Sequence, residues 1–167
     1  QIRLGKNFDG GYVVSRNAVL KSKNLISLGV YDDWSFESEF MEKNHAAKIF
    51  IFDGAVNFKF WIKYLIKNSY YFLIGKSSLK KLIENYFKLI QFPFFLCKSN
   101  INFYNKNILK HSTKIDLKKN SSITKVIQDN KLKNFFFKID IEENEYEILK
   151  ELIIFQNEIE CLVIEFH

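Results

Sequence analysis

The segment FFFKIDIEENEYEIL, residues Phe135 to Leu149, decides the fold together with IECLVIEFH, residues Ile159 to His167. The first reads as an apolar strand that ends in acids and turns directly into a helix, and the second as a buried strand that ends in a histidine. Strands that are apolar on both faces are typical of parallel sheets covered by helices. In open α/β sheets, ligands bind beyond the carboxyl ends of the strands. The two segments therefore predict a site where Asp140, Glu142 and His167 gather.

The preceding residues continue this alternation of strands and helices. NLISLGV (24–30), AKIFIFD (47–53) and INFYN (101–105) read as three further buried strands. YDDWSFESEF, between the first two, carries helix-start residues, with Asp33 or Ser35 as the N-cap. The pattern predicts a doubly wound, mostly parallel α/β sheet in a single domain of residues 1–167.

Apolar residues between the second and third strands recur at helical spacing. They predict one helix over 58–68 and another over 77–91, which Ser77 or Ser78 caps and Pro93 ends. We interpret this stretch, at about residues 57–100, as a helical insertion in the domain.

Composition and charge restrict the classes of function. The chain has 167 residues, 47% of them hydrophobic, and a net charge of +6, which fits one globular domain with a substantial core. Arg3 and Arg16 are its only arginines, and arginine is the usual reader of phosphate and guanine, so we expect no nucleic-acid partner. We also expect no membrane span and no secretory leader, and with only Cys97 and Cys161 as cysteines a cytoplasmic location follows. Because the chain begins with Gln1, we expect a piece of a longer protein.

Gly29 and Asp53 have the spacing of a nucleotide-binding unit. Gly29 ends the first strand, where a missing side chain lets a ligand approach, and Asp53 ends the second strand 24 residues later, at the offset of a ribose-binding acid. LGVYDDWSFE contains a single glycine, which disfavours a pyrophosphate cradle and favours an adenosine ligand without phosphates. The alternative is that Gly29 and Asp53 only make tight turns.

The last two strands carry the residues suited to proton transfer. Alternation puts Lys138, Asp140 and Glu142 on one face, and Glu165 and His167 on one face of the neighbouring strand. We expect a buried Lys138–Glu165 pair, because an unpaired buried lysine is costly. His167 can accept a proton near neutral pH, with a carboxylate orienting it. Alternatives are a solvated terminal histidine with helix-capping acids, or a divalent metal site; the spacing demands no metal, and we predict none.

Three segments in order resemble the FkbM-type family of S-adenosylmethionine-dependent methyltransferases: KNFDGGYVV, then SLGVYDDWSFESEF with IFIFD, then KIDIEENEYEIL with VIEFH. The resemblance covers most of the chain outside residues 57–120. The family pattern K-x-D-x-E-G-x-E is matched by Lys138, Asp140, Glu142 and Glu145, whereas Glu143 replaces the glycine. That departure would crowd the turn or mark a divergent substrate pocket.

The resemblance implies a Rossmann-like methyltransferase fold with strand order 3-2-1-4-5, then a closing strand pair that this chain lacks. An uncovered sheet edge is a liability, so we expect truncation or a homo-oligomeric partner across it. The implied activity is O-methylation, often of a sugar hydroxyl of a glycan. S-adenosylmethionine would lie over Gly29, with Asp53 on its ribose and Asp32 and Asp33 near its aminopropyl end. The residues expected to fold over the pocket are Asp9, Gly10, Gly11 and Tyr12.

Other functions fit the sequence less closely. The main alternative is a catalytically inactive module of this fold that binds a ligand or a partner chain. An RNA methyltransferase would need a basic face, and a nucleotide-dependent oxidoreductase would need the glycine cradle that LGVYDDW lacks.

Overall fold

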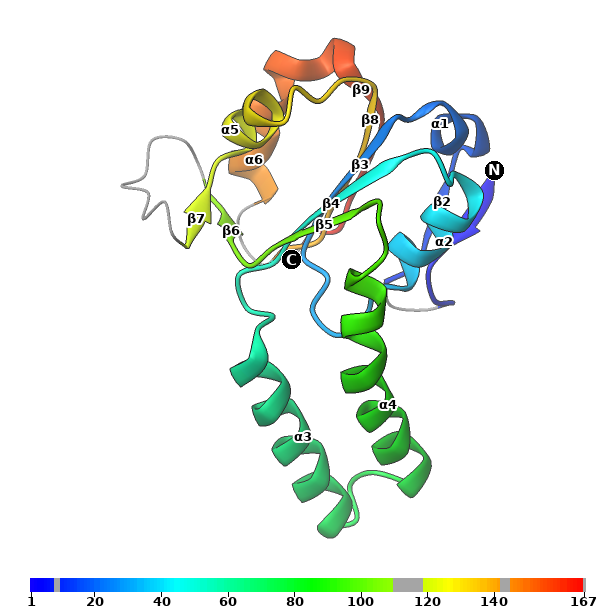
Figure 1. Cartoon of the computed structure of the whole chain (residues 1–167), viewed down its shortest axis with the longest axis vertical. Coiled ribbons are helices and arrows are strands. Elements are labelled where there is room, and N and C mark those ends of the chain that lie inside the picture. Colours follow the sequence, from blue (N-terminus) through cyan, green and yellow to red (C-terminus); the bar gives the residue numbers. More distant parts are fainter. Residues whose placement is uncertain (8–9, 110–118, 142–144, 167) are drawn as a thin grey trace.

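The computed structural model describes residues 1–7, 10–109, 119–141 and 145–166 (Figure 1). A five-stranded sheet lies at its centre, in the order β5-β4-β3-β8-β9, and all neighbouring strands are parallel. The strands are β3 (Asn24–Leu28), β4 (Lys48–Phe52), β5 (Ile101–Tyr104), β8 (Phe135–Ile139) and β9 (Ile159–Ile164). The predicted α/β class with a parallel sheet is confirmed.

Helices cover both faces of this sheet (Figure 1). Alternate strand residues face opposite layers, so Leu25 and Phe136 pack in one apolar core and Ile26 and Phe137 in the other. The first layer is formed mainly by α1 (Arg16–Lys21) and α2 (Ser35–Lys43), and the second by α5 (Ile123–Asp129) and α6 (Glu145–Leu152). Burial on both faces explains why the strands read as continuous apolar runs.

Smaller elements complete the domain. An antiparallel hairpin of β1 (Ile2–Leu4) and β2 (Tyr12–Val14) precedes α1, and β6 (Asn107–Ile108) pairs in parallel with β7 (Asn120–Ser121). A 3₁₀ helix, η1 (Ile153–Glu158), connects α6 to β9. β9 forms one edge of the sheet, and Leu162 on it is exposed.

The expected helical insertion is a hairpin of two long helices, α3 (Phe58–Leu73) and α4 (Leu79–Leu96), between β4 and β5. It projects away from the sheet (Figure 1). The side chains of Asn57 and Ser78 cap the two helices by accepting hydrogen bonds from Phe60 N and Lys81 N. No helix in the described part of the chain is both long and apolar enough to cross a bilayer.

Pro93 does not end its helix, so that prediction is wrong. α4 continues through Pro93 to Leu96, although proline removes a backbone donor and crowds the preceding turn. Phe92 and Phe95, on either side of it, are buried against Trp34. The packing of these rings holds the last turn in helical form despite the local cost.

Candidate functional site

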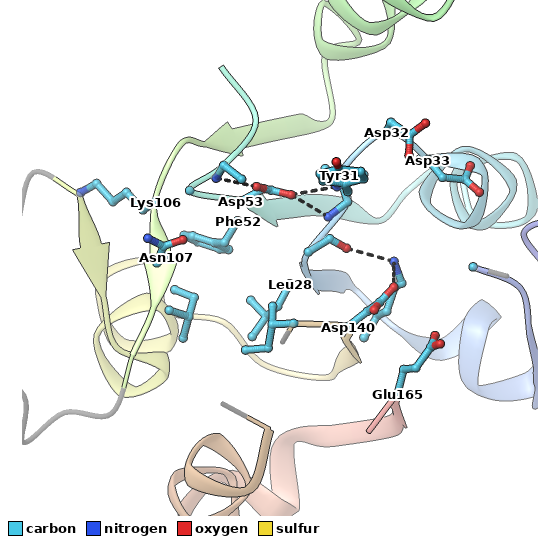
Figure 2. Close-up of a pocket in the computed structure, with 18 of the residues that line it drawn as sticks. Leu28, Tyr31, Asp32, Asp33, Phe52, Asp53, Lys106, Asn107, Asp140 and Glu165 are labelled. Carbon is cyan, nitrogen blue, oxygen red and sulfur yellow. Dashed lines mark hydrogen bonds and ion pairs between the residues drawn. The ribbon is translucent and has the colours of Figure 1, made fainter. Parts of the chain in front are cut away.

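A pocket of about 640 Å³ lies at the carboxyl ends of β3, β4 and β8 (Figure 2). Its walls come from the loop after β3 (29–33), the loop after β4 (53–55), residues 106–109, and Lys138, Asp140 and Ile141 with Glu165. The chain runs outward from β3 to β4 and β5 and then returns to β8 on the other side of β3. The pocket therefore lies at the point where the strand order reverses, which is where open α/β sheets bind ligands.

Asp53 joins the loops after β3 and β4. One carboxylate oxygen accepts from the backbone N–H groups of Val30 (3.0 Å) and Tyr31 (2.8 Å), and the other from those of Ala55 (2.8 Å) and Val56 (3.0 Å). Figure 2 shows this carboxylate between the loops. A carboxylate has about four lone-pair positions, so Asp53 is fully engaged by the backbone, as the turn-making alternative requires.

Gly29 brings two strand ends together. It has a φ of +76°, which favours glycine, and a Cβ at this position would lie 1.7 Å from the backbone oxygen of Asp140. Asp140 N donates to Leu28 O, 3.0 Å away. The space left by the missing side chain is thus filled by the neighbouring backbone and not, as the sequence had predicted, by a ligand.

Lys138 is buried beneath the pocket, but its partner differs from the expected one. Its Nζ lies 3.3 Å from Glu37 Oε1 in α2 and 3.7 Å from Asp140 Oδ2, and it donates to Gly29 O. Ser27 Oγ donates to the same Glu37 oxygen at 2.5 Å. Burial pushes the pKa of Lys138 down, but Glu37 and Asp140 together raise it above 10.5. The predicted Lys138–Glu165 pair is wrong, because Lys138 lies opposite Val163 and α2 supplies a closer carboxylate.

Tyr12 connects two carboxylates at the mouth of the pocket. Its hydroxyl is hydrogen-bonded to Glu165 Oε2 and lies 3.3 Å from Asp140 Oδ2. Burial and these acids raise the pKa of Tyr12 above its usual value of 10.0. One phenol proton serves only one acceptor at a time, so Tyr12 alone cannot satisfy both carboxylates.

Asp32 and Asp33 line the pocket as predicted, and each is held by a lysine. Asp32 forms an ion pair with Lys88 of α4 and accepts a 2.5 Å hydrogen bond from Tyr64 of α3. Burial pushes the pKa of Asp32 up, but the bonds from Lys88 and Tyr64 bring it below 3.8. Asp33 accepts a hydrogen bond from Ser35 N and pairs with Lys6 at 2.9 Å. The prediction of Asp33 or Ser35 as the N-cap of α2 is wrong, because Trp34 occupies the N-cap and no side chain caps the helix.

The glycines of the β1–β2 turn have different surroundings. Gly10 lines the pocket, and a Cβ there would lie 3.0 Å from Asp33 Oδ2. A Cβ on Gly11 would lie 1.7 Å from Lys6 O, so Gly11 serves the turn.

The structure unites most of the predicted site residues. The pocket is lined by Gly10, Gly29, Asp32, Asp33, Asp53 and Asp140. Tyr12 reaches it through Asp140 and Glu165. Asp9, Glu142 and His167 lie outside the described residues. Within the described ranges, no three His, Cys, Asp or Glu side chains are placed to hold a metal ion.

Sequence reasoning missed the roles of Glu37, Lys106 and Asn107. Glu37 lies in the first turn of α2, and no strand pattern could show that it meets Lys138. Lys106 and Asn107 line the end of the pocket away from Glu165 (Figure 2). The polar pair directly after the third predicted strand was the available signal for them.

Tyr12 and Tyr64, whose hydroxyls bond to carboxylates, should make the stability of the protein depend on pH in the alkaline range. Burial raises the pKa of both Tyr12 and Tyr64 above 10.0. Above pH 10 the unfolded chain therefore loses these two protons at a lower pH than the folded chain does. The free energy of unfolding should then fall as the pH rises. We expect the difference in unfolding free energy between the native protein and Tyr12→Phe to narrow as the pH is raised through this range in urea titrations. The exposed Tyr146→Phe is the matched control, and a difference constant with pH would contradict the assignment.

No family model matches the chain, and neither a curated protein nor a solved structure matches it. The functional interpretation therefore depends on the geometry of the pocket and on the sequence.

Proposed function

We propose that the pocket binds S-adenosylmethionine and that the protein is an O-methyltransferase acting on a hydroxyl, with a sugar of a glycan as the acceptor class. The observation that carries the proposal is the position of the pocket, at the strand-order reversal between β3 and β8 with acids at its mouth. The resemblance of KNFDGGYVV, SLGVYDDWSFESEF and KIDIEENEYEIL to FkbM-type methyltransferases supports the same reading. The sheet order β5-β4-β3-β8-β9 is compatible with a Rossmann-like methyltransferase fold.

The lining of the pocket fits a cationic nucleoside. A volume of about 640 Å³ is within the usual range for small-molecule sites. Leu28, Phe52 and Ile108 offer an apolar wall for a base. Asp140 and Glu165, at the other side, would favour the positive sulfonium over its neutral product.

Asp53 takes a modified role in this proposal. A ribose hydroxyl would have to share an oxygen that already accepts two N–H groups. We therefore assign Asp53 first to shaping the loop 29–33 on which the nucleoside would lie.

The bound cofactor would supply an electrophilic methyl group for in-line displacement. The chain must align the acceptor hydroxyl and receive its proton, and alignment contributes much of the rate in such reactions. We keep His167 as the proposed base, with Asp140 or Glu142 orienting the acceptor. The variant His167→Ala should lower turnover while leaving cofactor affinity nearly unchanged.

Calorimetry with S-adenosylmethionine and S-adenosylhomocysteine tests the pocket. We expect the native protein to bind both, and Asp140→Asn to weaken binding of the cationic cofactor about fivefold, with a smaller effect on the neutral product. The control is Asp129→Asn, an exposed carboxylate on α5. If the native protein takes up neither compound, the cofactor assignment fails.

A catalytically inactive ligand-binding module is the second candidate. The full engagement of Asp53 by four backbone amides favours it, because a pocket acid tied to structure is less available to a ligand. Transfer of a labelled methyl group to candidate sugars separates the two functions. Cofactor binding without transfer to any sugar would favour the inactive module.

A further inference from the structure

The α3–α4 hairpin carries most of the exposed apolar side chains in the described chain. Of 21 large hydrophobic residues that are exposed, 13 belong to residues 58–94. On α3 they recur at nearly every fourth residue: Phe58, Ile62, Ile66, Tyr70 and Leu73. On α4 the same spacing gives Leu79, Ile83, Phe87, Ile90 and Phe94. Each helix thus has one exposed apolar stripe, and contiguous apolar surface of this kind marks an interaction site.

The two stripes lie on the same side of the hairpin. Ser69 Oγ and Tyr86 Oη, which border the stripes, are 3.3 Å apart across the seam between the helices. Tyr64 and Lys88 lie across the hairpin from that contact, and both bind Asp32 of the pocket loop. The hairpin therefore has one side directed to the domain and one apolar side without a partner in the described chain.

The hairpin also carries the positive charge of the protein. Residues 58–96 contain seven lysines and one acid, Glu84, which gives 7 − 1 = +6. The whole chain has a net charge of +6, so the remaining residues sum to 6 − 6 = 0. Lys59, Lys63 and Lys67 follow the apolar stripe of α3 along one flank and are exposed.

The net positive charge of the hairpin indicates which kind of partner its apolar side can bind. A second copy docked hairpin to hairpin would bring +6 against +6, and the rest of the chain has no net negative charge to offset it. An anionic bilayer supplies both components: an apolar layer for the stripes and negative headgroups for the lysines, whose stems lie along apolar surface while their charges reach water. We infer that the hairpin binds the surface of anionic membranes, lying in the interface with its apolar side inward. This inference does not depend on the proposed methyl transfer.

Co-sedimentation of the full chain with vesicles tests the inference. We expect binding to vesicles of phosphatidylcholine with about a third phosphatidylserine, and at least tenfold weaker binding to pure phosphatidylcholine. Lys59→Gln, Lys63→Gln and Lys67→Gln combined should reduce binding to anionic vesicles about a hundredfold. The matched control replaces Lys23, Lys48 and Lys125, which are exposed on the body of the domain, with glutamine and should bind as the native protein does.

A second pair of variants tests the apolar contribution. Ile66 is 64% exposed and Leu73 79%, and replacing both with glutamine should weaken binding about tenfold or more. Ile153→Gln with Ile154→Gln removes equally exposed apolar side chains, at 66% and 73%, outside the hairpin and should have no effect. Equal binding to both vesicle types, loss of binding in the control variants, or self-association through the hairpin without vesicle binding would overturn the inference.

Discussion

Replacing Asp53 with alanine should lower the free energy of unfolding by about 3–5 kcal/mol. The substitution removes the acceptor of four backbone N–H groups, two of which belong to the buried residues Val30 and Val56. Hydrogen bonds to a charged acceptor contribute about 1.5–3 kcal/mol each, and the sum is smaller here because water from the pocket can reach some of the released donors. Ligand affinity should fall as well, because the loop 29–33 loses its support.

Urea denaturation measures the change in stability, and amide hydrogen exchange locates it. The N–H groups of Val30, Tyr31, Ala55 and Val56 should exchange faster in Asp53→Ala than other amides of the sheet. Asp53→Asn should give an intermediate loss, since it keeps one acceptor oxygen. Asp129→Asn, on an exposed carboxylate, should stay within about 0.5 kcal/mol of the native protein. A loss below about 1 kcal/mol for Asp53→Ala would show that the loops hold together without this residue.

Lys138→Met should be about as damaging, with an expected loss of about 3–5 kcal/mol. The side chain of Glu37 is fully buried, and Lys138 is the cation beside it. Without Lys138 the carboxylate remains in an apolar site with Ser27 as a hydrogen-bond donor. Glu37→Gln should cost less, because Lys138 would still contact Asp140 and Gly29 O.

The double variant Glu37→Gln, Lys138→Met separates the ion pair from packing. It should recover much of the stability lost in Lys138→Met, because the buried charge is gone while the introduced amide oxygen still accepts from Ser27. Losses that simply add in the double variant would argue against the pair. In the native protein the pKa of Lys138 is raised above 10.5, so its contribution is fully present below pH 10.5 and is lost as the pH rises through the higher folded value.

The sheet was accessible from sequence because its strands are short apolar runs that end in polar residues. The runs beginning at Asn24, Ala47 and Phe135 each contain a strand of the structure. Helices were predicted from periodicity, but their ends were not: α3 and α4 run to Leu73 and Leu96, five residues beyond each prediction. For α4, the packing of Phe92 and Phe95 against Trp34 carries the helix past Pro93, which a local proline signal could not show.

The position of the site was predicted, but the hydrogen bonds and ion pairs of its residues were not. Spacing alone put Asp53 and Gly29 together, because a βαβ unit brings strand ends to one edge. It could not show that backbone amides would occupy the carboxylate of Asp53. Strand alternation likewise placed Lys138 on the right face but missed Glu37, since the pattern of a strand holds no information on which helix covers it. In the observed register Lys138 lies opposite Val163, two residues before Glu165.

Because Asp32 bonds to both helices of the hairpin, ligand binding in the pocket and the position of the hairpin are thermodynamically coupled. Asp32 sits in the loop that Asp53 holds, and its carboxylate is shared by Lys88 and Tyr64 from the two long helices. A ligand that strengthens this bond on entering the pocket must, by reciprocity, be bound more tightly whenever the helices are held in place from outside. Through this ion pair, an interaction that fixes the hairpin from outside would raise the affinity of the pocket for such a ligand.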